Sequence, residues 1–126
     1  MKRAYAYMLV ALVGCTHVKS GVRVDAKAFE PRSCTSGQAR GFAGVELADQ
    51  HQQRLRLAQG LDEVLQVIYF APGAAVGTNL GPCGTMTFQN GLAVVNGVRN
   101  VEGTATLNCN DGHHTVVGSV AFEGCH

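Results

Sequence analysis

The chain has 126 residues, of which 46% are hydrophobic and 15% are charged, and its formal net charge is +1. This length suits one domain with a small core, and the sparse, scattered charges exclude the basic footprint of a nucleic-acid-binding protein. The 16 glycines, the absence of tryptophan and the valines and threonines late in the chain favour short strands and tight turns over helices.

The first 15 residues have the layout of an export signal. Lys2 and Arg3 give a positive start, an uncharged run follows, and Leu-Val-Gly at positions 12–14 precedes Cys15. This stretch resembles a bacterial lipoprotein signal, in which a leucine, a small or aliphatic residue and a glycine or alanine precede an obligatory cysteine. The resemblance implies that residues 1–14 are removed as a signal peptide. It also implies that the Cys15 sulfur receives a diacylglyceryl group carrying acyl chains such as palmitate.

Three other interpretations of this segment stay open. A transmembrane helix needs about 20 apolar residues, and the uncharged run from Ala4 to Cys15 is much shorter. The other two are an ordinary cleaved signal, in which Cys15 is incidental, and the first helix of a cytosolic domain. Under the lipoprotein interpretation the protein is exported and anchored to a bacterial membrane, and Thr16 after the cysteine favours the outer membrane over the inner one.

Residues 15–31 are expected to form the lipidated N-terminus and a tether that lifts the domain off the membrane. The segment has mixed polarity and little material for a core. Val22 and Val24 alternate with charged residues, which is compatible with a short edge strand. The disulfide-bonded domain is expected at residues 32–126.

The first half of this domain is predicted to contain three strand regions. Residues 33–47 form the first, with Val45 and Leu47 facing inward. Residues 54–57, Arg-Leu-Arg-Leu, alternate with the period of a half-buried strand. The two arginines are expected to face solvent on an edge strand, and the alternative is a paired-arginine anion site. The spacing in residues 61–70 also fits a short helix, but the β-branched and aromatic residues favour a strand.

Residues 73–82 are rich in glycine and end at a proline. A loop of about ten residues is long for a compact domain, and long loops are often functional. We therefore take Gly73, Thr78, Asn79 and Leu80 as candidate binding residues. The alternative is a plain crossover between two sheets.

The last third is predicted to form long antiparallel strands. Asn96 followed by Gly97 signals a type I′ hairpin turn, because both residues tolerate a positive φ. Residues 98–109 return from this turn with apolar side chains on one face and polar ones on the other. Residues 115–123 form the next strand, after a second turn.

Four cysteines follow Cys15: Cys34, Cys83, Cys109 and Cys125. An even number in a small exported domain indicates two disulfides. Their wide spacing lacks the closely paired ligands of a zinc site.

Hairpin geometry favours one pairing of these cysteines. Folding about the Asn-Gly turn places Cys109 opposite the residue next to Cys83, and a one-residue bulge near residue 90 would align the two. Cys125 then lies about 36 Å away along the neighbouring strand, at about 3.3 Å per residue, which is too far for a bridge to Cys109. We favour Cys83–Cys109 with Cys34–Cys125, and the alternative is Cys34–Cys109 with Cys83–Cys125.

These patterns predict a small all-β domain of about seven or eight antiparallel strands, arranged as a sandwich or flattened barrel and held by two disulfides. Candidate chemistry is sparse. His113 and His114 are adjacent and would point to opposite faces of an extended chain, and the aspartates fall in turns, where they bond to their own backbone. We expect no catalytic, metal or cofactor site.

The expected function is that of a lipid-anchored cell-envelope protein with a non-catalytic binding or structural role. Its partners would be the membrane, through the lipid, and an unidentified envelope protein or ligand, with no nucleic acid. The alternative is a small inhibitor or ligand-binding module, similar in plan to bacterial lysozyme-inhibitor lipoproteins, that presents the loop 73–82 beside Cys83. An enzyme would need a concave pocket with convergent polar groups.

Overall fold

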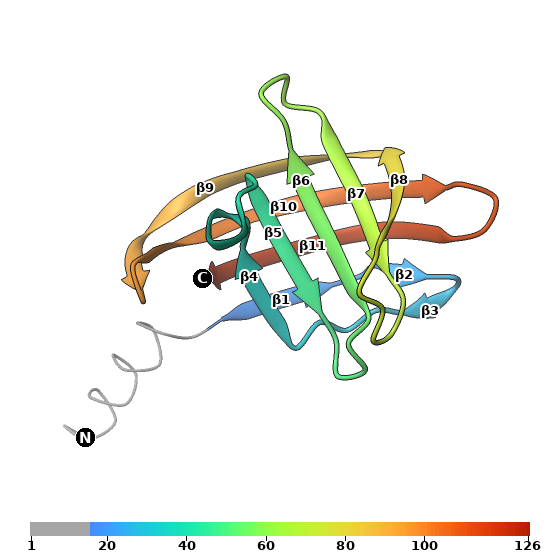
Figure 1. Cartoon of the computed structure of the whole chain (residues 1–126), viewed down its shortest axis with the longest axis horizontal. Helices are drawn as coiled ribbons and strands as arrows, with labels where there is room; N and C mark the ends of the chain where they lie inside the picture. The colour runs from blue at the N-terminus through green and yellow to red at the C-terminus, as the bar shows by residue number, and fades with distance from the viewer. Residues whose placement is uncertain (1–15) are drawn as a thin grey trace.

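The computed structural model describes residues 16–126, so the predictions for residues 1–14 and for Cys15 lie outside the described residues. The chain folds into strands connected by tight turns (Figure 1). The strands are β1 (His17–Ser20), β2 (Arg23–Val24), β3 (Lys27–Ala28), β4 (Ser33–Ser36), β5 (Gly44–Ala48), β6 (Arg54–Gln59), β7 (Leu65–Phe70), β8 (Thr78–Pro82), β9 (Gly84–Val95), β10 (Val98–Asn110) and β11 (Thr115–Cys125), and a 3₁₀ turn, η1 (Gly37–Arg40), follows β4.

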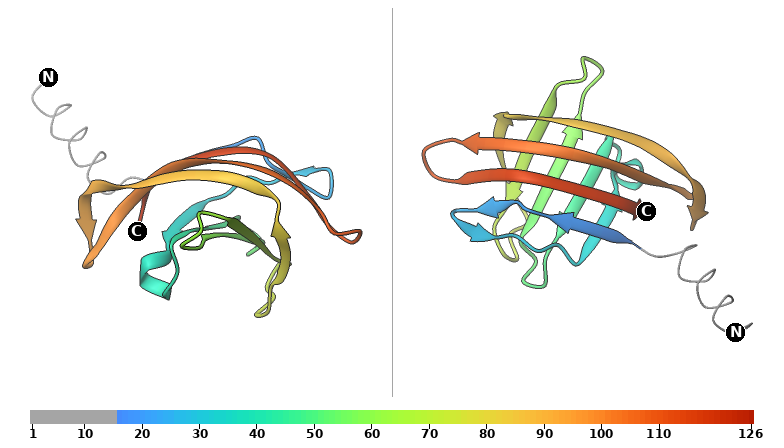
Figure 2. Two further views of the ribbon diagram at one scale, coloured as in Figure 1. Left: turned by 90° about the horizontal axis from the view of Figure 1, so that it is seen from above. Right: turned by 180° about the vertical axis from the view of Figure 1, so that it is seen from behind.

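The strands form two antiparallel sheets. The long sheet has the order β3-β2-β11-β10-β9, with β1 also paired to β11, and the short sheet has the order β4-β5-β6-β7-β8. The long sheet arches over the short one, and the strands of the two sheets cross at a steep angle (Figures 1 and 2), as in orthogonal packing. The predicted all-β sandwich is confirmed, and residues 32–126 contain eight strands, β4 to β11, where about seven or eight were expected.

The core lies between the two sheets and follows from the period of two in each strand. Leu55 and Leu57 of β6 are fully buried, and so are Val45 and Leu47 of β5. The long sheet covers them with its own inward-facing side chains, among them Met86, Ala105, Leu107, Val116, Val120 and Phe122. Each large side chain buried in this way contributes about 1.5–3 kcal/mol.

The predicted tether at residues 15–31 is wrong for the part that the structure describes. β1 and β2 both pair with β11, and Val22, Val24 and Phe29 are buried in the core. The segment has few apolar residues, but those few lie on the side that faces the core. The alternation of Val22 and Val24 indicated the strand that the structure shows as β2, although β2 pairs on both sides and is not an edge strand. β1 and β3, of four and two residues, carry too little periodicity to be recognised. Residues 16–31 therefore belong to the domain that was expected to begin at residue 32.

The β9–β10 hairpin turns at the predicted Asn-Gly pair, where Val95 pairs with Val98. The pairing of Arg99 with Val94 is followed by that of Val101 with Asn90, so three residues of β9 lie opposite one residue of β10. The bulge is where the sequence predicted it, but it inserts two residues instead of one. This irregular segment bends the hairpin toward the end of the molecule where β1 begins (Figure 2).

Candidate functional site

Both favoured disulfides are present, Cys34–Cys125 and Cys83–Cys109. Cys34 lies on β4 and Cys83 directly follows β8, so the two bonds tie the two edge strands of the short sheet to the long sheet. Cys83 sits at the corner where the chain passes from one sheet to the other, and its carbonyl accepts a hydrogen bond from the Asn108 amide at 2.8 Å. This corner, and not the expected alignment by a one-residue bulge, brings the second pair together.

The candidate loop 73–82 is only partly a loop. Thr78, Asn79 and Leu80 belong to β8, which pairs with β7. Gly81 adopts φ +92° at a register shift between these strands, where a bulge needs a residue that tolerates positive φ. The expectation of a loop across residues 78–82 is therefore wrong. The glycine-rich composition suggested a loop, but these residues form an edge strand with a bulge.

The remainder of that segment, from Gly73 to Gly77, contacts the short sheet near both of its ends, although Val76 within it is 84% exposed. The Gly73 amide bonds to the Gln52 carbonyl at 3.4 Å, and the Arg54 side chain donates to the Ala74 carbonyl at 2.9 Å. A Cβ on Gly77 would run into the rings and methyl groups of β7. These contacts attach the segment to the short sheet on both sides of the exposed Val76.

The outer face of the short sheet carries three arginines around one glutamate. Glu46 of β5 forms ion pairs with Arg40 at 3.4 Å, Arg54 at 3.3 Å and Arg56 at 3.0 Å. Its side chain is only 5% exposed, whereas those of Arg54 and Arg56 are 21% and 28% exposed. The prediction of an edge strand is wrong, because β6 is the central strand of its sheet. Alternation shows which face of a strand is polar and says nothing about its place in the sheet.

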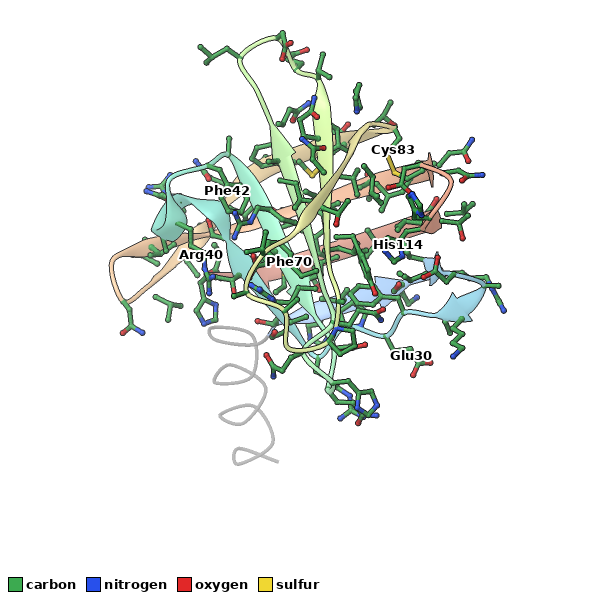
Figure 3. All side chains as sticks on the ribbon, turned by 45° about the vertical axis from the view of Figure 1, so that its right-hand side comes forward. Glu30, Arg40, Phe42, Phe70, Cys83 and His114 are labelled. Atoms are coloured by element: carbon green, nitrogen blue, oxygen red, sulfur yellow. A yellow bond between two sulfur atoms is a disulfide. The ribbon has the colours of Figure 1, made fainter. Side chains whose placement is uncertain are left out.

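The guanidinium groups of two of these arginines pack against aromatic rings. The Arg54 guanidinium lies 4.0 Å from the Phe70 ring centroid, and the Arg56 guanidinium lies 5.0 Å from that of Phe42 and 5.2 Å from that of Phe70. Figure 3 shows Phe42, Phe70 and Arg40 on the short-sheet side of the molecule. We call the surface formed by Arg40, Arg54, Arg56, Glu46, Phe42 and Phe70 the arginine cluster.

The arginine cluster has chemistry suited to an anion. Three guanidinium groups and one carboxylate leave a formal charge of +2, from three positive charges minus one negative. Stacked guanidinium groups are pre-organised donors for carboxylate or phosphate oxygens. The sequence indicated Arg54 and Arg56, but it missed Glu46, Arg40 and the rings. Glu46 stands directly opposite Arg56 in the strand register, and its polar position within an apolar strand was the available signal.

A second cluster joins two turns. His114 Nδ1 lies 3.1 Å from Asp25 Oδ2, and Asp25 Oδ1 accepts the Thr115 amide at 2.9 Å. The Thr115 amide, followed by His114, lowers the pKa of Asp25 below its usual 3.8. The His114 ring lies 4.7 Å from that of Tyr69, centroid to centroid, and burial raises the Tyr69 pKa above its ordinary value of 10.0. The cluster links the β2–β3 hairpin to the turn that precedes β11.

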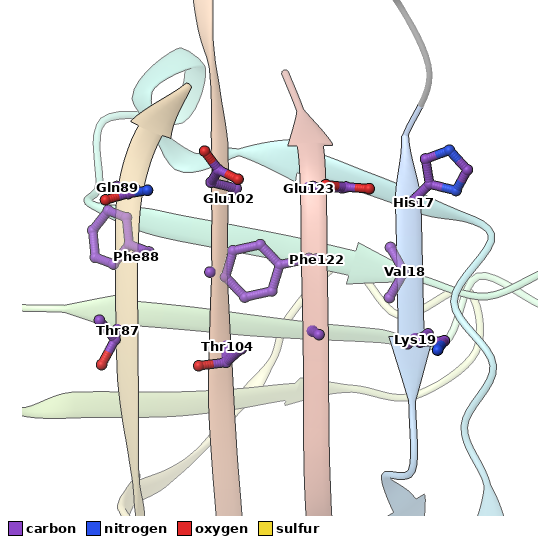
Figure 4. Close-up of a pocket in the computed structure, with 12 residues that line it drawn as sticks. His17, Val18, Lys19, Thr87, Phe88, Gln89, Glu102, Thr104, Phe122 and Glu123 are labelled. Carbon is purple, nitrogen blue, oxygen red and sulfur yellow. The ribbon is translucent and has the colours of Figure 1, made fainter. Parts of the chain in front are cut away.

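An open groove of about 620 Å³ crosses β9, β10, β11 and β1 (Figure 4). Gly103 lies near its middle, between Phe88 and Phe122 in the register of the long sheet. Lys19, Glu102 and Glu123 put charges of both signs around it. The sequence did not predict this groove, because it depends on β1 joining the sheet.

Among residues 16–126, no three histidine, cysteine, aspartate or glutamate side chains are grouped so that they could hold a metal ion. The same residues contain no helix that is long and apolar enough to cross a membrane. In comparisons with known proteins, no protein-family model matches this chain, and no curated protein or solved structure matches it either.

Proposed function

We propose that this chain is a lipid-anchored cell-envelope protein with a non-catalytic binding role. The observation that carries the proposal is which cysteines form disulfides. Of five cysteines in the chain, the four that follow Cys15 are bonded to one another in two disulfides. Cys15 therefore has no partner cysteine within the chain, and it stands where a lipoprotein signal has its acylated residue.

Two kinds of observation support export and anchoring. Disulfides that cross-link two sheets are typical of proteins in oxidising compartments outside the cytoplasm. A diacylglyceryl group supplies two acyl chains, which is enough for stable membrane attachment. Thr16 in the next position favours delivery to the outer membrane in a bacterium with two membranes.

The arginine cluster is the surface that we assign to binding. It combines a formal excess of positive charge with the partly exposed ring of Phe42, while Phe70 packs against Arg54 and is only 5% exposed. A partner with carboxylate or phosphate groups would match it. We thereby assign the binding role to this sheet face instead of to the segment from residue 73 to residue 82.

The intact mass of the protein purified from its membrane, with and without reduction, tests the proposal. We expect a chain that begins at Cys15, carries acyl mass, and gains two hydrogens for each of two disulfides on reduction. Cys15→Ala should leave the chain uncleaved and without lipid, whereas the control Cys34→Ala/Cys125→Ala should still be processed and acylated. An unprocessed wild-type chain, or a Cys15→Ala chain that still matures with lipid, would overturn the proposal.

A further inference from the structure

We propose that the tip of the β9–β10 hairpin, residues 91–99, contacts the lipid surface and seats the domain against the membrane. This inference rests on the proposed acylation of Cys15. It adds a second point of membrane contact and an orientation that the lipid alone would not define.

The proposed anchor is joined directly to the long sheet. The Thr16 hydroxyl donates to the Gly124 carbonyl at 3.0 Å, and His17 pairs with Glu123 in the long sheet. Cys15 is the residue before Thr16, and consecutive Cα atoms are about 3.8 Å apart. With no tether between lipid and sheet, the end of the domain at Thr16 must lie close to the membrane.

The hairpin tip lies at this same end of the domain. The start of β1, the end of β11 and the tip of the β9–β10 hairpin all gather there (Figures 1 and 2). A hollow of about 320 Å³ lies between these segments and includes two carboxylates; its lining is His17, Gly91, Leu92, Ala93, Asn100, Val101, Glu102, Glu123 and Gly124. The first residues of the domain and the bulge of the hairpin therefore face one another across a single hollow.

The tip itself is apolar. Residues 91–98 read Gly-Leu-Ala-Val-Val-Asn-Gly-Val and carry no charge, and Arg99 follows. Leu92 is fully exposed and Val94 is 57% exposed. A hairpin tip in water is ordinarily polar, and exposed apolar groups that gather on one element mark contact with a membrane or a protein. An apolar tip next to one exposed cation fits the interface between acyl chains and headgroups.

The chain has no tryptophan, so Leu92→Trp places a single fluorescent reporter at the tip. The matched control is Leu61→Trp, at an equally exposed leucine in the β6–β7 turn. The acylated variants would be reconstituted into vesicles of phosphatidylethanolamine and phosphatidylglycerol, with and without brominated acyl chains. For Leu92→Trp we expect blue-shifted emission and a loss of about half of its intensity with brominated lipid, as for a side chain about 5–10 Å into the interface. Leu61→Trp should show neither change.

Each outcome decides the inference separately from the proposed function. Acylation of the same sample is read first by intact mass. Unquenched emission from acylated Leu92→Trp overturns the inference and leaves the anchor intact. A blue shift without quenching means that the tip contacts protein, for instance a second copy, and also overturns it.

If the sample carries no lipid, the proposed function fails. Quenching of Leu92→Trp on adding the same vesicles would then uphold contact between the tip and lipid, and the absence of quenching would overturn it. Val94→Trp repeats the test at a second tip position.

Discussion

Asp25 shows how one exposed side chain can join distant parts of this fold. It adopts φ +50° in the β2–β3 turn, a conformation that aspartate and asparagine tolerate better than most residues. Its two carboxylate oxygens reach the Thr115 amide and the His114 ring. The sequence placed Asp25 in a segment that was expected to be a tether, and only the fold gives it these partners.

This cluster predicts a pH-dependent part of the stability. Because the folded protein lowers the pKa of Asp25 below 3.8, the ionised carboxylate stabilises the folded state above about pH 4, and this contribution is lost as the pH falls through the unfolded and then the folded pKa. Asp25→Asn keeps the turn geometry and an acceptor but removes the charge. We expect it to lower the free energy of unfolding at pH 7 by at most about 1 kcal/mol, as for an exposed pair, with a corresponding fall in melting temperature, and to have a much smaller effect at pH 3.

Thermal unfolding at both pH values measures this difference. Asp62→Asn is the control, because Asp62 also accepts a backbone amide in a turn but has no histidine among its hydrogen-bond and ion-pair partners. An Asp25→Asn deficit of equal size at pH 7 and pH 3 would contradict the assigned role of the charge.

At the scale of elements, side chains of β5 and β6 contact one another on both the inner and the outer face of the short sheet. Val45 and Leu47 pack inward against Leu57 and Leu55, their neighbours in the register, while Glu46 gathers three arginines on the outer face. Period-two alternation predicted the inner face correctly, because burial follows residue order along a single strand. The outer cluster depends on which strand lies opposite, and it was not predicted as a whole.

Glu46→Gln tests this outer face. The substitution keeps the shape of the side chain and leaves three neighbouring guanidinium groups without their shared carboxylate. We expect a loss of about 2–3 kcal/mol of unfolding free energy, below the full cost of breaking a buried pair because the arginines are partly exposed. Urea unfolding measures it, with Glu30→Gln at an exposed position as a control that should stay within about 0.5 kcal/mol of the wild type. Wild-type stability of Glu46→Gln would show that the cluster is not structural.

At the scale of the whole molecule, the two disulfides close loops of very different length. Cys34–Cys125 spans 91 residues and Cys83–Cys109 spans 26. In the chain-entropy account, a bond across the longer loop restricts the unfolded chain more, by about 4.6 kcal/mol against about 3.5 kcal/mol. Both bonds also hold an edge of the short sheet against the long sheet.

We therefore expect Cys34→Ser/Cys125→Ser to lose about 1 kcal/mol more than Cys83→Ser/Cys109→Ser. Urea unfolding of the two double variants, under conditions that keep the remaining disulfide intact, measures the difference. If removing the shorter link costs as much or more, the corner between β8 and β9 outweighs loop entropy in this fold.

The sequence by itself determined the fold class and the hairpin at Asn96 and Gly97, and it favoured the observed pairing of the cysteines over one alternative. Each follows from local information, namely the alternation within a strand, the residues that a turn requires and the reach of a hairpin. Only the tertiary structure decided that residues 17–28 join the long sheet, that β8 is a strand and that Arg40 and Glu46 complete the arginine cluster. These features depend on contacts between segments far apart in the chain, as when Thr16 bonds to Gly124. No pattern along one strand records which distant strand will lie beside it.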